Sequence, residues 1–161
     1  MFKFDLKQGY HHIDISEEHQ SYLGFSWNLE GKNRYFVYTV LPFGLTSAPF
    51  IFTKVMRVLI KFWRENLIMI AIFIDDGLGT NKDYEKTKKD SSFVKKSLKS
   101  SGFLENIEKS VWEPQQVIQW LGILANLEKM EFYIPQKRLI SAEKLINDII
   151  TSLPYTSARK L

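Results

Sequence analysis

The chain has 161 residues, of which 45% are hydrophobic and 14% aromatic, which suits one domain with a real core and excludes a mainly disordered chain. The absence of cysteine excludes disulfides and thiolate metal sites. The net charge of +4 is compatible with a nucleic-acid partner but does not require one.

The longest apolar run, residues 67–74, is too short to span a bilayer and ends in charge. The N-terminus lacks the charged-then-apolar pattern of a secretory signal. We therefore expect an intracellular protein with no membrane segment, and the sequence does not distinguish a cytoplasmic from a nuclear location.

A strand and a hairpin are predicted first. Residues 1–6 alternate apolar and polar side chains, which predicts a strand that ends in an acid. Aromatic-rich stretches at 22–27 and 35–40 flank a polar loop at 28–33, a pattern that is typical of a β-hairpin.

A long amphipathic helix follows. Thr46 or Ser47 can cap it, Pro49 is tolerated in its first turn, and we expect it to end near Asn66. Its basic residues recur at helical spacing and leave the other face apolar. They are Lys54, Arg57, Lys61 and Arg64. This stripe is a candidate for phosphate contact, although a solvated face is the commoner meaning of such a pattern.

The remaining chain predicts a second hairpin over residues 67–80, and then a lysine-rich helix over 83–101 that Gly102 stops. Acids are interleaved with these lysines, so we interpret the helix surface as a solvated face. Strands are predicted at residues 103–107, 117–124 and 130–134. A last helix is predicted to start near Pro135 or Ser141.

Without the first hairpin, the order is strand, helix, strand, strand, helix, strand. This is the split βαβ pattern of a ferredoxin-like sheet, so the predicted fold class is α+β. In this topology the first strand neighbours the second hairpin, and Asp5 would lie close to Asp75 and Asp76. The fold alone does not choose a function.

The adjacent acids Asp75 and Asp76 follow a buried strand, where burial raises the cost of ionising both. A divalent cation such as Mg²⁺ removes that conflict, because it prefers hard oxygen ligands. An Asp-Asp-Gly sequence after a strand is also a common solvated turn, so the pair alone does not decide. A site at His11, His12 and Asp14 is disfavoured, because no further spaced ligand pair accompanies them.

Five stretches, in this order, resemble the palm of reverse transcriptases. Asp5 matches the first catalytic aspartate, and residues 41–49 are similar to the Leu-Pro-Phe-Gly-Leu-x-x-Ala-Pro loop before the palm helix. Residues 73–76 are similar to the Tyr-x-Asp-Asp box, with Phe in place of Tyr. Lys109 falls where the family has a basic residue, and residues 120–122 are similar to the primer-grip turn. Five ordered matches are far more specific than one.

The resemblance implies a ferredoxin-like polymerase palm with an inserted hairpin over residues 1–135, and the start of the thumb over 136–161. Residues 22–27 and 106–116 resemble DIRS-type retrotransposons, which integrate through a tyrosine recombinase, with gypsy-like LTR elements as near neighbours. The family carries a fingers region before the first aspartate, so we expect this chain to be a fragment of a retroelement polyprotein with RNase H and recombinase regions elsewhere.

The implied activity is template-directed DNA synthesis from deoxynucleoside triphosphates, on an RNA or DNA template with a primer. Two ions, Mg²⁺ or Mn²⁺, would catalyse nucleotidyl transfer. Asp5, Asp75 and Asp76 would hold them with help from the Leu6 carbonyl, and Lys109 would act near the departing pyrophosphate. For Lys109, an ordinary exposed lysine is an equally good interpretation.

The nucleotide pocket implied by the resemblance includes Tyr10, Phe43 and Gly44 in addition to Leu6. Tyr10 would reject ribonucleotides by clashing with a 2′-hydroxyl. The primer end would be held by Trp120, Leu121 and Gly122. For Phe43 and Gly44, the plainer interpretation is a Pro-Phe-Gly turn that packs on the core. For Trp120, Leu121 and Gly122, it is an ordinary pair of strands.

Two other functions share some of these sequence features. RNA-dependent RNA polymerases share the two-metal chemistry, but they generally have Gly before the Asp pair and an acid five residues after the first Asp, where this chain has Ile74 and Tyr10. A catalytically inactive or domesticated fragment could at most bind nucleic acid. The intact set of Asp5, Asp75 and Asp76 argues against long decay.

Overall fold

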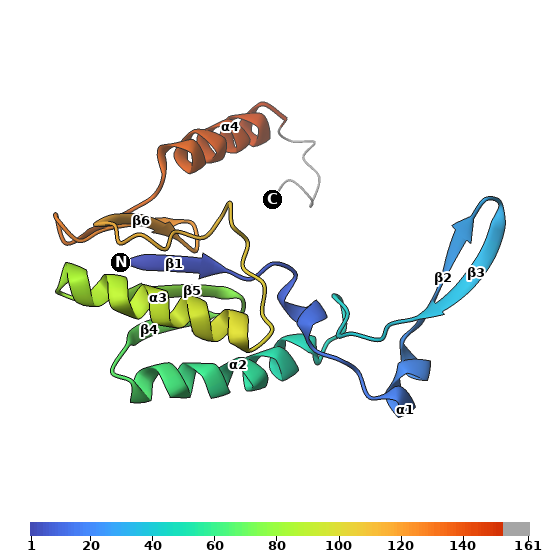
Figure 1. The fold of residues 1–161 in the computed structure, drawn as a ribbon. Helices are drawn as coiled ribbons and strands as arrows, with labels where there is room; N and C mark the ends of the chain where they lie inside the picture. The colour runs from blue at the N-terminus through green and yellow to red at the C-terminus, as the bar shows by residue number, and fades with distance from the viewer. Residues whose placement is uncertain (153–161) are drawn as a thin grey trace. The chain divides into compact units, whose positions relative to one another are not determined.

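The structure is a computed structural model that describes residues 1–152. The chain has a mixed α+β fold and divides into two compact units, Met1–Pro114 and Gln115–Leu161 (Figure 1). This division lies ahead of the predicted domain boundary after residue 135, and part of the predicted thumb segment lies outside the described residues. Within residues 1–152, no helix is both long and apolar enough to cross a membrane.

The first unit is built on an antiparallel sheet of β1 (Phe2–Asp5), β5 (Asp76–Thr80) and β4 (Met69–Phe73), in that spatial order. The long helices of this unit are α2 (Ala48–Glu65) and α3 (Tyr84–Ser100). Because β5 lies between β1 and β4, the β1–α2–β4 connection is a split βαβ unit, which confirms this part of the predicted topology.

The predicted strand at 103–107 is wrong as a regular strand. Within it, only Glu105 forms an isolated bridge to β1, with Leu6, and the next bridge, between Val111 and Lys3, lies beyond the predicted strand. Between the bridges, the Lys109 and Ser110 N–H groups both donate to the Asn106 carbonyl, at 3.3 and 3.0 Å. Because this turn lies between the two bridges, the segment does not pair continuously with β1.

The inserted hairpin consists of β2 (Gly24–Leu29) and β3 (Lys32–Val37). Its turn contains only Glu30 and Gly31, both at positive φ, so the predicted loop at 28–33 is too long. Two residues at positive φ match the twist of the flanking strands. The short helical segments before it are η1 (Gly9–His12), α1 (Glu17–Gln20) and η2 (Ser21–Leu23).

The second unit contains an antiparallel sheet in the order β6 (Val117–Trp120), β7 (Ile123–Asn126) and β8 (Glu131–Tyr133), followed by α4 (Gln136–Ser152). The single strand predicted at 117–124 is therefore two strands. Leu121 and Gly122 form the turn between them with φ of 48° and 78°.

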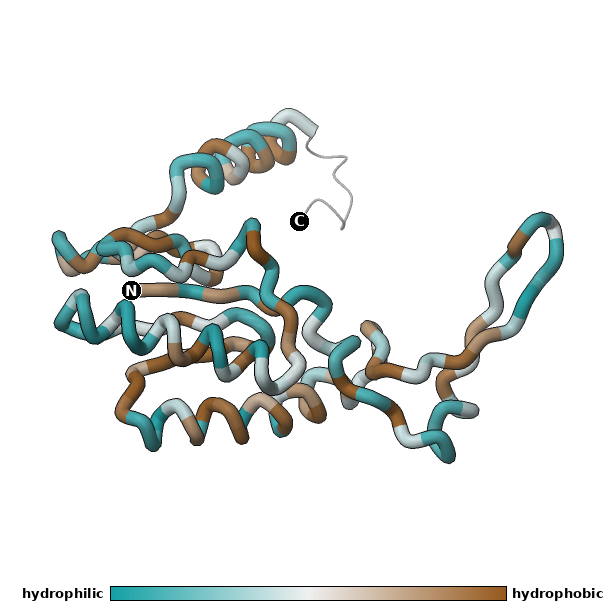
Figure 2. Tube along the Cα trace, in the orientation of Figure 1, coloured by the Kyte–Doolittle hydropathy of each residue, from teal (hydrophilic) through white to brown (hydrophobic). Residues whose placement is uncertain are grey.

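The core of the first unit is aromatic. Phe52, Met56 and Trp63 form the buried stripe of α2, whose apolar and polar residues alternate in Figure 2. The Trp63 indole N–H donates to Ser97 Oγ at 2.7 Å and so ties α2 to α3. The ring of Trp112 stacks on Phe4, with centroids 5.6 Å apart. These contacts hold both helices and the 103–112 segment against the sheet.

Several charged side chains of α2 and α3 form ion pairs. Ion pairs at N···O distances of 3.0 to 3.1 Å join Lys86 to Asp90, Lys88 to Glu113 and Lys95 to Glu105. This agrees with our interpretation of α3 as a solvated face. On α2, Lys61 pairs with Glu65 at 3.8 Å and Arg64 donates to the Ile70 carbonyl at 3.2 Å. The Lys54 ammonium group lies 4.8 Å from the centroid of the Phe50 ring. Three of the four residues of the basic stripe are thus engaged within the chain, which weakens the hypothesis of phosphate contact.

Candidate active site

Three carboxylates from two distant segments meet at one end of the β1–β5–β4 sheet. The register of β1 with β5 places Asp5 directly opposite Asp76. Asp75 lies in the two-residue turn between β4 and β5, and its carbonyl accepts a hydrogen bond from the Leu6 N–H at 3.1 Å. The juxtaposition that the topology predicted is therefore present.

The turn that carries Asp75 is strained. Pairing of Phe73 with Asp76 leaves only Ile74 and Asp75 to reverse the chain, and Ile74 has a φ of 55°. A β-branched residue rarely adopts this conformation, which costs on the order of 1–3 kcal/mol and persists only where the surroundings fix it. Here the two strands on either side fix it.

The backbone of Asp5 is held by the segment after α3. The Asp5 N–H donates to Ser110 Oγ at 3.2 Å, and the Asp5 carbonyl accepts from the Asn106 N–H at 2.8 Å. Between these anchors, Lys109 Nζ lies 3.4 Å from Asp5 Oδ2. The expected basic residue is thus next to the carboxylates. Sequence reasoning missed the positioning roles of Asn106 and Ser110, whose only signal was their place in the 106–116 stretch that resembles DIRS-type elements.

The carboxylates make one another harder to ionise. Burial raises the pKa of Asp75 above its usual value, a hydrogen bond to its own backbone opposes this, and the charge of Asp5 raises it again. Burial also raises the pKa of Asp76, and the charges of Asp75 and Asp5 add to that effect. Lys109 lowers both pKa values but does not offset the burial and repulsion.

Tyr10 connects the carboxylates to the loop before α2. Its buried ring lies 4.9 Å from the ring of Phe43 and 5.2 Å from that of Phe52. Burial raises the pKa of the Tyr10 hydroxyl, and the charge of Asp75 raises it further. Phe43 is 61% exposed, and the next residue, Gly44, has a φ of 88°. Tyr10 therefore lies within electrostatic reach of Asp75 and contacts Phe43, and the nucleotide pocket stays a prediction.

The turn after β1 is fixed by a histidine that sequence reasoning had not placed. The Leu104 N–H donates to Nε2 of His12 at 3.2 Å, and Nδ1 of His12 lies 3.2 Å from the Gly9 carbonyl. Gly9 itself permits a close approach, since a Cβ there would lie 2.9 Å from the Phe52 ring and 3.4 Å from Asp75 Cβ. Both ring nitrogens of His12 are thus engaged within the chain.

The donor chemistry of the site suits a hard divalent cation. Three carboxylates repel one another with Lys109 as the nearby ion-pair partner, and a cation would relieve that repulsion. Among residues 1–152, however, no three His, Cys, Asp or Glu side chains already converge as a metal site. Mg²⁺ usually takes only one or two carboxylates and completes its shell with water and phosphate oxygens, so these residues fit such an ion.

The predicted primer-grip residues Trp120, Leu121 and Gly122 lie in the second unit, at the turn between β6 and β7. Arg138 of α4 donates to the Gly122 carbonyl at 3.3 Å, and its guanidinium occupies the space a Cβ at Gly122 would need. The Trp120 indole nitrogen is buried without a hydrogen-bond partner. The primer-grip role stays a prediction.

Comparison with known proteins identifies the class to which this fold and site belong. Residues 1–125 match the family described as reverse transcriptase (RNA-dependent DNA polymerase). The chain therefore belongs to the reverse transcriptase family.

Its relatives are segments of polyproteins. The chain is 31% identical over 138 residues to the retrovirus-related Pol polyprotein from transposon opus of Drosophila melanogaster, covering 85% of this chain and 13% of that protein. It is 34% identical over 86 residues to the putative enzymatic polyprotein of Cassava vein mosaic virus, covering 53% and 12%. The chain thus spans about an eighth of these relatives.

Solved structures share the fold. The foamy viral protease-reverse transcriptase dRH in complex with ds DNA aligns over 99% of this chain and 25% of its own, with a TM-score of 0.74 and 22% identity. The foamy viral protease-reverse transcriptase in complex with RNA/DNA hybrid aligns over 89% and 18%, with a TM-score of 0.73 and 20% identity. These likenesses agree with the mixed α+β fold.

The carboxylate cluster predicts an unusual pH dependence. Because the folded pKa values of Asp75 and Asp76 lie above the usual 3.8, the folded chain retains protons that the unfolded chain releases. This contribution to stability is present below pH 3.8 and is lost as pH rises through the folded pKa values. Asp76→Asn should therefore raise the free energy of unfolding at pH 7 relative to the unmodified chain, measured by urea denaturation.

The control is Asp14→Asn, which changes an exposed acid outside the cluster and should alter stability by less than about 0.5 kcal/mol. A lower stability of Asp76→Asn at pH 7, or an equal gain in the control, would show that the carboxylates do not repel one another as described.

Proposed function

We propose that this chain is the palm of an RNA-directed DNA polymerase over residues 1–135, followed by the start of a thumb over 136–161. The observation that carries the proposal is the meeting of Asp5 with Asp75 and Asp76 across the β1–β5 pair. The split βαβ topology, the hairpin between β1 and α2, and the family membership of the chain support it.

In this proposal, Asp5, Asp75 and Asp76 hold two divalent cations, Mg²⁺ or Mn²⁺, beside the Leu6 carbonyl. Such ions, when bound there, would supply charge stabilisation for the attacking 3′-hydroxyl and for the leaving pyrophosphate. The protein contributes the geometry, because strand pairing and the Ser110 and Asn106 hydrogen bonds fix the Asp5 backbone.

Lys109 is proposed to donate a proton toward the departing pyrophosphate. Its ammonium group lies 3.4 Å from Asp5, and its side chain is 66% exposed. It is thus next to the carboxylates and still accessible to a triphosphate, as a general acid must be.

The incoming deoxynucleoside triphosphate is proposed to bind over Tyr10, Phe43 and Gly44. The exposed ring of Phe43 is available for contact with a base, and it packs on the buried ring of Tyr10. A template with its primer is the proposed partner, supported by foamy viral relatives of the fold that were solved with RNA/DNA hybrid and with dsDNA. Trp120, Leu121 and Gly122 are proposed to hold the primer end.

The source we propose is a retroelement polyprotein of the DIRS type, with fingers, RNase H and recombinase regions elsewhere in it. The basis is the sequence at 22–27 and 106–116. The relatives named above are a transposon polyprotein and a plant viral polyprotein, which is compatible with this assignment and with a gypsy-like one.

Asp75→Asn tests the activity. In a polypeptide that contains this chain with the other regions of its polyprotein, primer extension should fall by at least about a hundredfold, because a cation ligand is lost. Asp14→Asn, the matched control at an exposed acid, should leave synthesis within about twofold. The same two variants of the 161-residue chain should unfold cooperatively in urea.

Near-normal synthesis by Asp75→Asn would refute the two-metal assignment. A parent polypeptide with no synthesis would favour an inactive fragment that at most binds nucleic acid.

Tyr10→Val tests the choice of sugar. Loss of the ring should raise ribonucleotide incorporation at least about tenfold, equal to about 1.4 kcal/mol of discrimination, while deoxynucleotide use falls much less. Tyr10→Phe keeps the ring and should keep the discrimination. The measurement is single-nucleotide primer extension with each sugar. If Tyr10→Val lowered both rates equally, the ring would serve packing only, and a parent enzyme that prefers ribonucleotides would contradict DNA synthesis itself.

A further inference from the structure

A cavity of about 240 Å³ lies between α3 and the segment of residues 103–112. We call it the α3 cavity. Two of the residues that line it, Leu98 and Phe103, are buried. Two others, Leu104 and Ile107, are 61% and 82% exposed. The cavity thus combines buried apolar walls with an exposed apolar rim, and this combination is typical of sites that bind small molecules.

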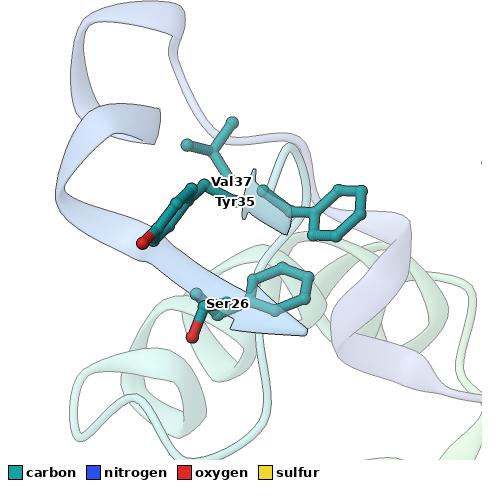
Figure 3. A pocket seen from close by; sticks show the side chains of 6 residues that line it. Ser26, Tyr35 and Val37 are labelled. Atoms are coloured by element: carbon teal, nitrogen blue, oxygen red, sulfur yellow. The ribbon is translucent and has the colours of Figure 1, made fainter. Parts of the chain in front are cut away.

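A larger hollow, of about 700 Å³, is less suited to a small ligand. It lies on the hairpin of β2 and β3, where Ser26, Tyr35 and Val37 are among the residues that line it (Figure 3). Every residue of these two strands is exposed, so this hollow is open to water on all sides. The α3 cavity, by contrast, can remove an apolar group from water.

The charged side chains of the α3 cavity leave one positive charge unpaired. Lys95 forms an ion pair with Glu105 at 3.1 Å, and Glu105 also accepts a hydrogen bond from the indole N–H of Trp112. Lys99 follows Lys95 by one helical turn and also lines the cavity, but it forms no ion pair among residues 1–152. An anionic group on a ligand would therefore find a partner in Lys99.

The wall that Trp112 contributes is fixed without a ligand. Its ring stacks on Phe4, and the Lys95 ammonium group lies 5.3 Å from its centroid. The hydrogen bond to Glu105 holds the indole N–H as well. A ligand that contacts Trp112 would therefore lose little free energy to the ordering of this side chain.

We propose that the α3 cavity binds a small apolar carboxylic acid. The apolar body packs on Leu98, Phe103 and Trp112, and the carboxylate pairs with Lys99 at the surface. The cavity is smaller than the roughly 300–1,000 Å³ of sites for drug-sized ligands, so the body is about the size of a fused pair of rings or a short acyl chain. No lining residue belongs to the candidate active site, and the proposal does not require polymerase activity.

Occupancy of the α3 cavity would act on the turn that holds Asp5. Glu105 and Ile107 line the cavity and flank Asn106, whose N–H donates to the Asp5 carbonyl at 2.8 Å. A ligand held between α3 and this segment stabilises the docked segment, so the hydrogen bond to Asp5 opens less often. The amide of Asn106 thus reports occupancy from outside the cavity.

The test is a titration of the ¹⁵N-labelled 161-residue chain with 1-naphthoate. We expect saturable shifts of the Trp112 indole resonance and of the Phe103 and Leu104 amides, with a dissociation constant on the order of 0.1 mM for so small a ligand. Hydrogen exchange of the Asn106 amide should slow. The neutral analogue 1-naphthamide should bind about threefold more weakly, because an exposed ion pair contributes about this much.

Variants at exposed side chains identify the two parts of the site. Ile107→Ser removes part of the apolar rim and should weaken 1-naphthoate binding about fivefold. Lys99→Gln should weaken 1-naphthoate binding about threefold and leave 1-naphthamide binding unchanged. Val58→Ser on α2 and Lys96→Gln on α3 are the matched controls, because both side chains are exposed and neither lines the cavity. Both controls should bind as the unmodified chain does.

Several results would overturn the proposal. One is the absence of saturable shifts, and another is an equal loss for Ile107→Ser and Val58→Ser. Equal binding of 1-naphthoate and 1-naphthamide would show that Lys99 does not select an anion. Shifts centred on Tyr35 and Val37 would place the ligand in the hairpin hollow of Figure 3. Asp75→Asn should bind 1-naphthoate normally, so this proposal and the proposed function can fail separately.

Discussion

The antiparallel pairing of β1 with β5 is the constraint on which the site depends. It places Asp5 opposite Asp76 and, through the Leu6 hydrogen bond to the Asp75 carbonyl, fixes the turn beside them. The pairing is coupled to the core, because Gly77 and Gly79 of β5 leave room for the buried rings of Phe4 and Phe2. Side chains at these glycines would push β5 away from β1, so packing and site geometry rest on the same contact.

The site combines several interactions that are unfavourable for the folded chain. Three acids share one end of a sheet, two of them with pKa values raised by burial and mutual repulsion, and Ile74 sits in a strained turn. Such features stabilise nothing by themselves and are common at functional sites. A bound partner of opposite charge is the simplest reason for a chain to maintain them. Membership of the reverse transcriptase family is consistent with a divalent cation as that partner.

Local sequence signals predicted much of the fold. Gly102 follows the end of α3 as expected, and the apolar run before Asp75 contains a strand. The failures lie where local patterns carry little information. The 103–107 segment has strand-like residues, but the turn at Asn106 interrupts its pairing with β1. Leu121–Gly122 lacks the Asn-Gly or Asp-Gly sequence that usually marks such a turn.

The carboxylates, Lys109 and Tyr10 could be found from the sequence, because spacing and family resemblance pointed to them. Ser110 and His12 could not. Ser110 reaches Asp5 across 105 positions and His12 reaches Leu104 across 92, and no periodicity predicts a single side-chain hydrogen bond over such a separation. Their importance becomes visible only when the two segments are brought side by side.

The central claim is that Asp5, Asp75 and Asp76 form one cation-binding cluster. The most direct test is a titration of the ¹⁵N-labelled chain with Mn²⁺, following paramagnetic broadening of its amide resonances. The account predicts that broadening starts at the amides of these three residues and is lost in the Asp5→Asn variant. Broadening centred elsewhere, or unchanged by Asp5→Asn, would contradict it.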